Sequence, residues 1–283
     1  MIHKEVEWPK VAVLRLYSPK PPRDSTRPKA ALHGNPVAIC TVLSPKVTNA
    51  TRSDIISITV VNMSKCIHLL VGLLFPILTW AIPPGFVYVD EVTRNSVVDL
   101  RYLTGNNFLQ RPVQGYFVNR AILSKPAAEA LAKVENELQT YGLGILIFDA
   151  YRPQRAVNDF VNWAKDLQDV KAKAEYYPNV DKSNLFKEGY IAEQSGHTRG
   201  STVDLTIIPI GETKPLDMGT IFDYFGLQSW PSYPNLLPQQ RANRLLLQTI
   251  MTKYGFKPYP QEWWHFTLEN EPYPNTYFDF EVR

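Results

Sequence analysis

Two histidines and two acidic residues in the second half of the chain have the types and spacing of a metal-dependent hydrolytic site. The stretch SGHTRGSTVDLT places His197 seven positions before Asp204, and QEWWHF places Glu262 three positions before His265. Two imidazoles and one carboxylate give zinc three protein ligands, and a catalytic zinc site keeps its fourth position for water. A nearby carboxylate that is not a ligand takes the proton from that water. The pattern therefore predicts His197, Asp204 and His265 as zinc ligands and Glu262 as the general base.

The surroundings of these residues bear on whether they bind a metal. A lone histidine is more often structural than a ligand, but His197 and His265 are the only histidines after residue 81. Asp204 lies within an apolar stretch, where a buried carboxylate is costly unless something neutralises it. A divalent cation would neutralise it. The alternative is a buried pair of Asp204 with His197 or with Arg199.

Arg152 is a candidate for stabilising negative charge during a reaction. It follows an apolar stretch in FDAYRP, and Pro153 favours an extended backbone at the residue before it. Amide hydrolysis builds negative charge on the carbonyl oxygen, and a positive donor aimed at that oxygen lowers the barrier. Asp149 could orient the guanidinium. The residues alone are equally compatible with a surface arginine paired with a local aspartate.

The composition is that of a globular protein with an uneven charge distribution. The chain is 45% hydrophobic and 20% charged, which is enough to bury a core. Residues 1–62 carry nine basic and four acidic side chains, whereas residues 82–283 carry 20 basic and 23 acidic ones. Because this body is mildly acidic, we expect no nucleic-acid partner. Cys40 and Cys66 both precede Ala81, which excludes a disulfide framework and a cysteine zinc site in the body.

The segment MSKCIHLLVGLLFPILTWAIPPG resembles a secretory signal in the middle of the chain. Lys65 precedes a stretch from Ile67 to Ile82 without charge, which is short for a spanning helix, and TWA has the small-x-small pattern of a cleavage site. We therefore expect residues 63–81 to contact the membrane only transiently and to direct the protein to the periplasm. The alternatives are a buried helix or strand, an internal anchor, and a cytoplasmic protein.

Residues 1–62 are expected to be an upstream extension that is not native, with synthesis beginning at Met63, because a signal belongs at an N-terminus. This stretch has scattered prolines and no sustained period, so we expect it to be poorly ordered. The rival interpretation is a genuine extension.

Residues 82–283 show the mixture of strand and helix patterns that is typical of one α+β domain. The expected strands are 85–92, 144–150, 201–210 and 262–268, and the expected helices are 125–141, 153–167 and 242–254. Pro126 near the start and Gly142 after the end mark the limits of the first helix.

Four spaced motifs together resemble the D-alanyl-D-alanine dipeptidases, the zinc family that includes the vancomycin-resistance dipeptidase. They are DAYRP, SGHTRGSTVDLT, MGTIFD and EWWHF, and the resemblance runs from about Val87 to Val282 with GYFVNR, YYPN and EPYPNTYFDF. It implies a single compact zinc-peptidase domain, with a central, mainly antiparallel sheet flanked by helices and one Zn²⁺ per chain. Residues 1–62 have no counterpart in it.

The resemblance also implies roles for single residues. The matches to the family's zinc ligands, catalytic base and oxyanion-stabilising arginine are His197, Asp204, His265, Glu262 and Arg152. The residues assigned to substrate binding are Ser195, Asp223, Tyr102 and Asp149. Asp223 matches the acid that holds the substrate's free ammonium group. The sequence departs from the family at Gly196, where some relatives have serine, and in the loop RYLTGNNF around Tyr102.

The implied reaction is hydrolysis of the small dipeptide D-Ala-D-Ala to two D-alanines, with a zinc-activated water as the nucleophile. One alternative is a zinc D,D-carboxypeptidase that acts on peptidoglycan stem peptides, and another is a metal-stabilised binding module without catalysis. An ammonium-binding acid at Asp223 favours the free dipeptide. The presence of both Glu262 and Arg152 disfavours the binding module. The sequence does not specify an oligomeric state.

Overall fold

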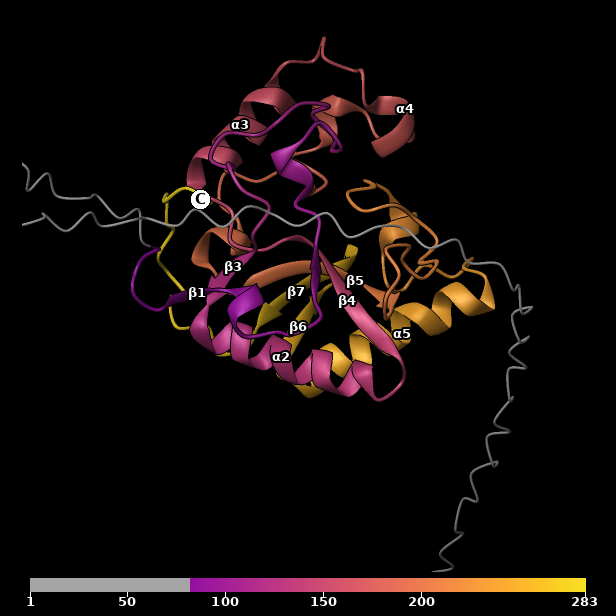
Figure 1. The fold of residues 1–283 in the computed structure, drawn as a ribbon. Coiled ribbons are helices and arrows are strands. Elements are labelled where there is room, and N and C mark those ends of the chain that lie inside the picture. The colour runs from indigo at the N-terminus through magenta and orange to yellow at the C-terminus, as the bar shows by residue number, and fades with distance from the viewer. Residues whose placement is uncertain (1–81) are drawn as a thin grey trace, which may run out of the picture. The chain divides into compact units, whose positions relative to one another are not determined.

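The computed structural model describes residues 82–283, so the expectations for residues 1–62 and 63–81 lie outside the described residues. A five-stranded sheet forms the centre of this part of the chain (Figure 1). In spatial order its strands are β2 (Val97–Val98), β4 (Leu143–Asp149), β5 (Thr202–Pro209), β7 (Glu262–Leu268) and β6 (Phe256–Tyr259). The short β2 pairs parallel with β4, and every other pair is antiparallel. The predicted α+β fold with a mainly antiparallel sheet is confirmed.

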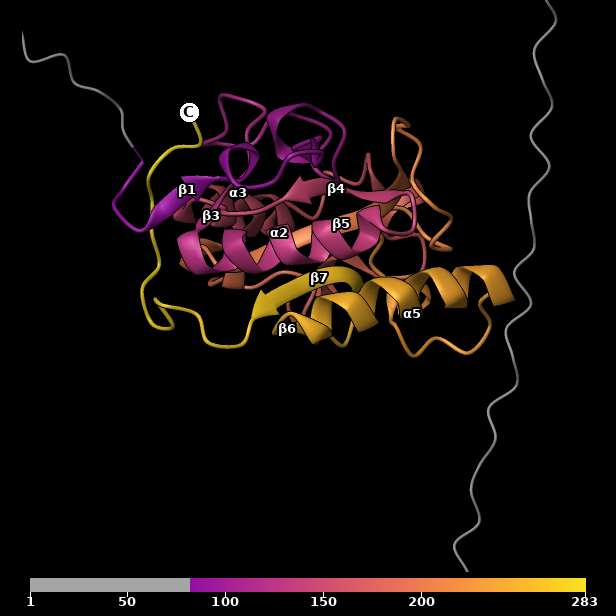
Figure 2. The ribbon, with the colours of Figure 1, turned by 60° about the horizontal axis from the view of Figure 1, so that its bottom comes forward.

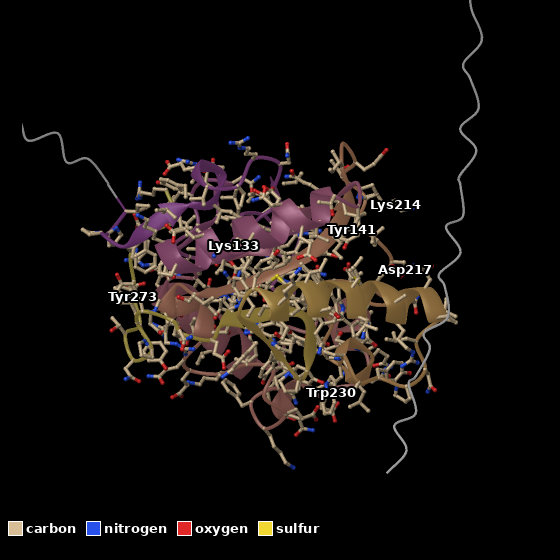
Figure 3. The ribbon with its side chains drawn as sticks, turned by 90° about the horizontal axis from the view of Figure 1, so that it is seen from below. Lys133, Tyr141, Lys214, Asp217, Trp230 and Tyr273 are labelled. Atoms are coloured by element: carbon tan, nitrogen blue, oxygen red, sulfur yellow. The ribbon has the colours of Figure 1, made fainter. Side chains whose placement is uncertain are left out.

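Two long helices lie side by side and pack against the sheet. They are α2 (Lys125–Gln139) and α5 (Pro238–Lys253), and Figure 2 and Figure 3 show them next to each other. Along α2, Leu131, Val134 and Leu138 are fully buried at helical spacing, so this stripe faces the core. Helix α3 (Gln154–Lys165) lies on the side of the sheet away from α2 and α5 (Figure 1).

The first strand pair of the described residues differs from the prediction. Strand β1 (Phe86–Tyr88) pairs antiparallel with β3 (Ile122–Ser124), and the chain then turns into a 3-10 helix, η3 (Val89–Glu91). The expected strand over 85–92 was therefore too long. The reason is local, because Val89 accepts hydrogen bonds from the backbone N–H groups of Val92 and Thr93, which closes a turn.

The structure differs from the prediction at two places in the C-terminal half, one helix start and one missed strand. Helix α5 begins at Pro238, four residues before the expected start, because proline fits the first turn of a helix. Strand β6 was not predicted, since Pro258 lies inside it. Proline is tolerated there because β6 is an edge strand of the sheet.

Short elements complete the described part of the chain. They are η4 (Arg101–Leu103), α4 (Lys173–Tyr176), η5 (Lys182–Asn184), η6 (Gly196–Arg199) and η7 (Leu227–Ser229). Between residues 82 and 283, none of the helices has the length and the apolar character that crossing a membrane requires.

Candidate metal centre and active site

Neighbouring strands bring two of the predicted metal ligands together. Asp204 on β5 and His265 on β7 are direct partners in the antiparallel ladder, so their side chains leave the sheet on the same face. Oδ1 of Asp204 lies 3.2 Å from Nδ1 of His265. The sheet register, which both strands share, therefore sets the separation of these two donors.

The third ligand, His197, reaches the same point from η6 rather than from a strand. Ser195 caps this short helix, since its Oγ accepts the backbone N–H of His197 at 3.3 Å. Nδ1 of His197 donates to the carbonyl of Ala150 at 2.7 Å, which leaves the lone pair on Nε2 for a metal. Nε2 lies 3.2 Å from Oδ2 of Asp204 and 3.3 Å from Nδ1 of His265.

The three side chains fit a divalent cation. Their donor atoms lie within 4.8 Å of one another, and Oδ1 of Asp204 is buried without a hydrogen-bond partner among the described residues. Burial alone would lower the pKa of His265, but the carboxylates of Asp204 and Glu262 raise it to about 9. Positive charge is thus stabilised where the donors converge, and two imidazoles with one carboxylate are a donor set that suits zinc.

A distortion of the sheet places Glu262 beside the ligands. Glu262 and His265 are three positions apart on β7, so a regular strand would point their side chains to opposite faces. The pairing is irregular here, because Pro258 pairs with Phe266 whereas the next residue, Tyr259, pairs with Glu262. As a result, Oε2 of Glu262 lies 3.3 Å from Nδ1 of His265.

Arg152 enters the site just beyond the end of β4. The pairing of β4 with β5 shifts before Asp149, which becomes the partner of Asp204. The Arg152 side chain is largely buried, and its Nη2 lies 3.6 Å from Oδ2 of Asp204. The guanidinium carbon also lies 5.0 Å from the centre of the Tyr102 ring and 4.9 Å from that of Phe160. These rings limit the orientations that the guanidinium can adopt.

Asp149 contacts Arg152 but does not line the cavity. The carboxylate is fully buried, with Oδ2 accepting from Nε of Arg152 at 2.8 Å and Oδ1 accepting from the hydroxyl of Tyr116 at 2.7 Å. Burial raises the pKa of Asp149, and Arg152 and His197 act against this shift. The expected substrate contact of Asp149 is therefore corrected to a positioning role. A residue without exposed surface cannot touch a ligand in the cavity.

Asp223 and Tyr102 form a second polar part of the site. Neither residue lies on a strand of the sheet. The hydroxyl of Tyr102 donates to Oδ2 of Asp223 at 2.9 Å, and both side chains are almost entirely buried. Burial raises the pKa of Asp223 well above its ordinary value, and the nearby Asp204 adds to the shift. Asp223 also has a φ of 62°, a left-handed conformation that non-glycine residues rarely adopt.

One cavity connects these groups. Its volume is ≈ 210 Å³, small beside the roughly 300–1,000 Å³ of pockets for drug-sized ligands. All three predicted metal ligands line it, together with Glu262, Arg152, Ser195, Asp223 and Tyr102. The structure thus brings together every predicted site residue except Asp149, which lies directly behind Arg152.

Comparison with known proteins identifies the family of this chain. The sequence model of a family described as D-ala-D-ala dipeptidase matches residues 83–283, well over half of the chain. The chain belongs to the D-Ala-D-Ala dipeptidase family. D-alanyl-D-alanine dipeptidases of Enterococcus faecium and Streptomyces coelicolor are each 40% identical to it, over 199 and 197 residues. Each alignment covers 70% of this chain and 98% of the relative.

A solved structure is also similar in part. It is a vancomycin resistance D,D-pentapeptidase in complex with Zn(II), with 14% identity and a TM-score of 0.35 over 55% of this chain and 77% of that chain. The D-Ala-D-Ala dipeptidases are zinc metallopeptidases, and the donor set of this chain suits zinc. The predicted enzyme class and zinc cofactor are therefore confirmed.

Among the residues of this dipeptidase-family site that were not predicted are two tyrosines. Tyr259 lines the cavity, with its ring centre 5.2 Å from that of His265, and Tyr116 holds Asp149. Tyr259 lies on the unpredicted edge strand β6. Tyr116 occurs in GYFVNR, a motif of the resemblance, but its contact with a residue 33 positions away becomes visible only in the folded chain.

Proposed function

We propose that this zinc peptidase hydrolyses the dipeptide D-Ala-D-Ala to two molecules of D-alanine. The observation that carries the proposal is the content of one small cavity. The metal-binding cluster, a carboxylate beside it, a guanidinium and a buried second acid all line the same ≈ 210 Å³. Relatives named D-alanyl-D-alanine dipeptidase, which align with this chain over 98% of their own length, support it.

Glu262 is placed to move the proton that hydrolysis requires. A zinc ion bound by His197, Asp204 and His265 supplies Lewis acidity, which lowers the pKa of water and polarises the peptide carbonyl. Glu262 accepts a proton from the attacking water as the new C–O bond forms. It then delivers this proton to the departing amine as the C–N bond breaks. Its partial exposure to the cavity allows both transfers.

Arg152 is placed to stabilise the charge that develops on the carbonyl oxygen. Preorganised donors are effective because they need no rearrangement during the reaction. Asp149 fixes Nε of Arg152, so the terminal nitrogens remain directed to the cavity side, where Nη2 approaches Asp204. An arginine held in this way stays charged at every physiological pH.

Asp223 explains why a free dipeptide suits the cavity better than an acylated peptide. With a divalent cation in place, the carboxylates of Asp149, Asp204, Asp223 and Glu262 exceed the charge of the cation and Arg152 by one. A zwitterionic dipeptide adds no net charge, and its ammonium group favours the ionised form of Asp223 that burial opposes. An N-acylated peptide brings a carboxylate without an ammonium, which leaves Asp223 buried with the hydroxyl of Tyr102 but without a cationic partner. This reasoning disfavours a carboxypeptidase acting on peptidoglycan stems.

The test is a comparison of two substrates with purified protein. We expect release of D-alanine from D-Ala-D-Ala, loss of that activity in a chelator, and recovery when zinc is restored. We expect N-acetyl-D-Ala-D-Ala to be cleaved at least about a hundredfold less efficiently, because a buried charge would lose its partner. Equal cleavage of both substrates would instead support the carboxypeptidase, and zinc binding without any cleavage would support the non-catalytic module.

We also propose that the enzyme acts in the periplasm. The support is the sequence of residues 63–81 alone, which has the composition of a secretory signal. N-terminal sequencing of the protein recovered from the periplasmic fraction tests this, and a first residue of Ile82 is expected. Recovery of the intact chain from the cytoplasm would contradict the proposal.

A further inference from the structure

The acid proposed to bind the ammonium group lies on an irregular segment rather than on a strand or helix. Residues 210–237 connect β5 to α5, and η7 (Leu227–Ser229) is the only regular element within them. Connections of this length without secondary structure are uncommon unless they are functional. We call residues 217–230 the recognition loop, because Asp223 lies near its middle.

Arg244 on α5 holds this loop through three backbone carbonyls. Its Nε donates to Met218 at 2.6 Å, Nη1 to Trp230 at 3.0 Å and Nη2 to Gln228 at 2.8 Å. These carbonyls come from both sides of Asp223 in the sequence. One guanidinium therefore fixes the distance between the two arms of the loop.

The environment of Arg244 is unusual for an arginine. The residue is only 4% exposed, yet among residues 82–283 no carboxylate lies within ion-pair distance of it. Burial lowers its pKa to about 10, so it remains charged at neutral pH. A buried charge without a direct ion pair is costly. The carbonyl dipoles of the loop offset that cost, with help from the more distant carboxylate of Asp217 and from the Trp263 ring, whose centre lies 5.8 Å from the guanidinium carbon. All three hydrogen bonds of the guanidinium therefore form in this one conformation of the loop.

Weaker contacts support the same arrangement. Nδ2 of Asn243 donates to the carbonyl of Asp217 at 2.8 Å, and Nε2 of Gln240 donates to Oδ2 of Asp217 at 2.9 Å. Figure 3 shows Asp217 beside the N-terminal half of α5. Each of these bonds joins α5 to the beginning of the recognition loop, so the helix acts as the rigid base of the loop.

The conformation of Asp223 explains why such a base is needed. Its left-handed φ of 62° is unfavourable for a side chain other than glycine, and such a conformation persists only when the surroundings impose it. Tyr102 contacts the carboxylate itself but does not restrain the backbone on either side. Next to Asp223, the backbone N–H of Phe225 donates to the carbonyl of Tyr176 at 2.7 Å, and Oγ of Ser229 donates to the carbonyl of Tyr224 at 2.6 Å. The side chains of α5 restrain the backbone further out, at both arms of the loop.

We propose that Arg244 is a positioning residue that sets Asp223 at the ammonium site and thereby tunes recognition of the free amino group. This inference rests on the proposed dipeptidase function. It assigns the choice between free and blocked amino termini to a side chain that lies outside the cavity and touches neither metal nor substrate.

The test compares Arg244→Lys with Arg241→Lys in the full chain. Lysine keeps the charge but lacks the planar fork that reaches three carbonyls. Arg241 is the matched control, because it lies on the same helix and donates to the carbonyl of Pro234, outside the recognition loop. For each protein, kcat and KM for D-Ala-D-Ala, the inhibition constant of propionyl-D-alanine and the bound zinc are measured. Propionyl-D-alanine is the same dipeptide without the amino group.

In Arg244→Lys we expect KM for D-Ala-D-Ala to rise about tenfold, while the inhibition constant of propionyl-D-alanine changes less than about twofold and zinc content is unchanged. Arg241→Lys should resemble the wild type in all measurements. If both constants rise together, or if KM does not change, Arg244 only maintains the fold and the inference is wrong. If the wild type itself releases no D-alanine, the proposed function fails with it.

A second variant keeps the test decisive if Arg244→Lys does not fold. Asn243→Ala removes one of the weaker bonds to the loop and leaves Arg244 in place. We expect the same selective rise of KM at a smaller size, about threefold. A rise in the inhibition constant of the same size would again overturn the inference.

Discussion

The two ends of the cavity are built in different ways. At the metal end, Asp204 and His265 are partners in a five-stranded sheet, and His197 is fixed by a backbone carbonyl next to β4. At the end proposed to bind the ammonium group, Asp223 lies on a loop that is held in part by side chains of α5. The proposed catalytic groups are therefore attached to the hydrogen-bonded sheet, whereas the proposed recognition of the ammonium group depends on a loop that side-chain substitutions can move.

The largest effect is expected from removing a metal ligand, which tests the metal end of the cavity. We expect His197→Ala to lose bound zinc and at least about a thousandfold in activity, because the metal supplies several kcal/mol of transition-state stabilisation. Metal analysis of the dialysed protein and a D-alanine release assay measure both effects. Retention of stoichiometric zinc would remove His197 from the ligand set.

The next largest effect should separate catalysis from metal binding at the same end. Glu262→Gln keeps the shape of the side chain but removes its proton acceptor, so we expect turnover to fall about 10²–10⁴-fold with zinc content unchanged. The same metal analysis is the control. Full activity in this variant would exclude Glu262 as the base.

At the other end, Asp223→Asn should damage recognition alone. We expect kcat/KM for D-Ala-D-Ala to fall about 10- to 100-fold, because the ammonium loses a charged hydrogen-bond partner. Zinc content should stay near the wild-type value, and the inhibition constant of propionyl-D-alanine should not rise, because this ligand has no ammonium group to lose a partner. An equal loss of affinity for both ligands would place the ammonium elsewhere.

A smaller effect is expected behind Arg152. Tyr116→Phe removes the hydroxyl that Asp149 accepts, so the guanidinium should be held less firmly. We expect kcat to fall about three- to tenfold with little change in KM, since Arg152 acts on charge that develops only in the transition state. A change confined to KM would contradict this role.

The smallest expected effect concerns stability and sharpens the contrast between the two ends. Because burial raises the pKa of Asp223, this carboxyl group ionises more readily in the unfolded chain, and that difference lowers the stability of the fold at neutral pH. Below its unfolded pKa of about 4 the group is protonated in both states and the penalty is absent. We therefore expect Asp223→Asn to be more stable than wild type by about 1 kcal/mol at pH 7 and equally stable at pH 3. Urea titration at both values measures this, and a less stable variant at pH 7 would refute it.

Residue type and spacing predicted most of the metal end. The apolar runs around Asp204 and His265 predicted strands β5 and β7. Because histidine is scarce in residues 82–283, His197 and His265 were both candidate ligands. The two irregularities in strand pairing that place Glu262 and Asp149 could not be predicted from local sequence, because they depend on how β4 pairs with β5 and β6 pairs with β7.

Predictions for the ammonium end depended more on resemblance. Asp223 was assigned from its motif, and neither its left-handed backbone nor its contact with Tyr102, 121 residues away, has a local signal. Strand β6 and Tyr259 were missed for another reason. Pro258 breaks the alternation that marks a strand, and its tolerance follows only from the edge position of β6.

The short stretch from Asp149 to Arg152 has a consequence for how this enzyme could diversify. Ala150 orients the ring of His197, and the backbone N–H of Arg152 donates to the carbonyl of His197 at 3.3 Å. Substitutions in this stretch would alter ion retention and turnover jointly, so selection could not adjust one without the other. Substitutions in the recognition loop would leave metal retention and turnover unchanged, so new substrate preferences should arise there first.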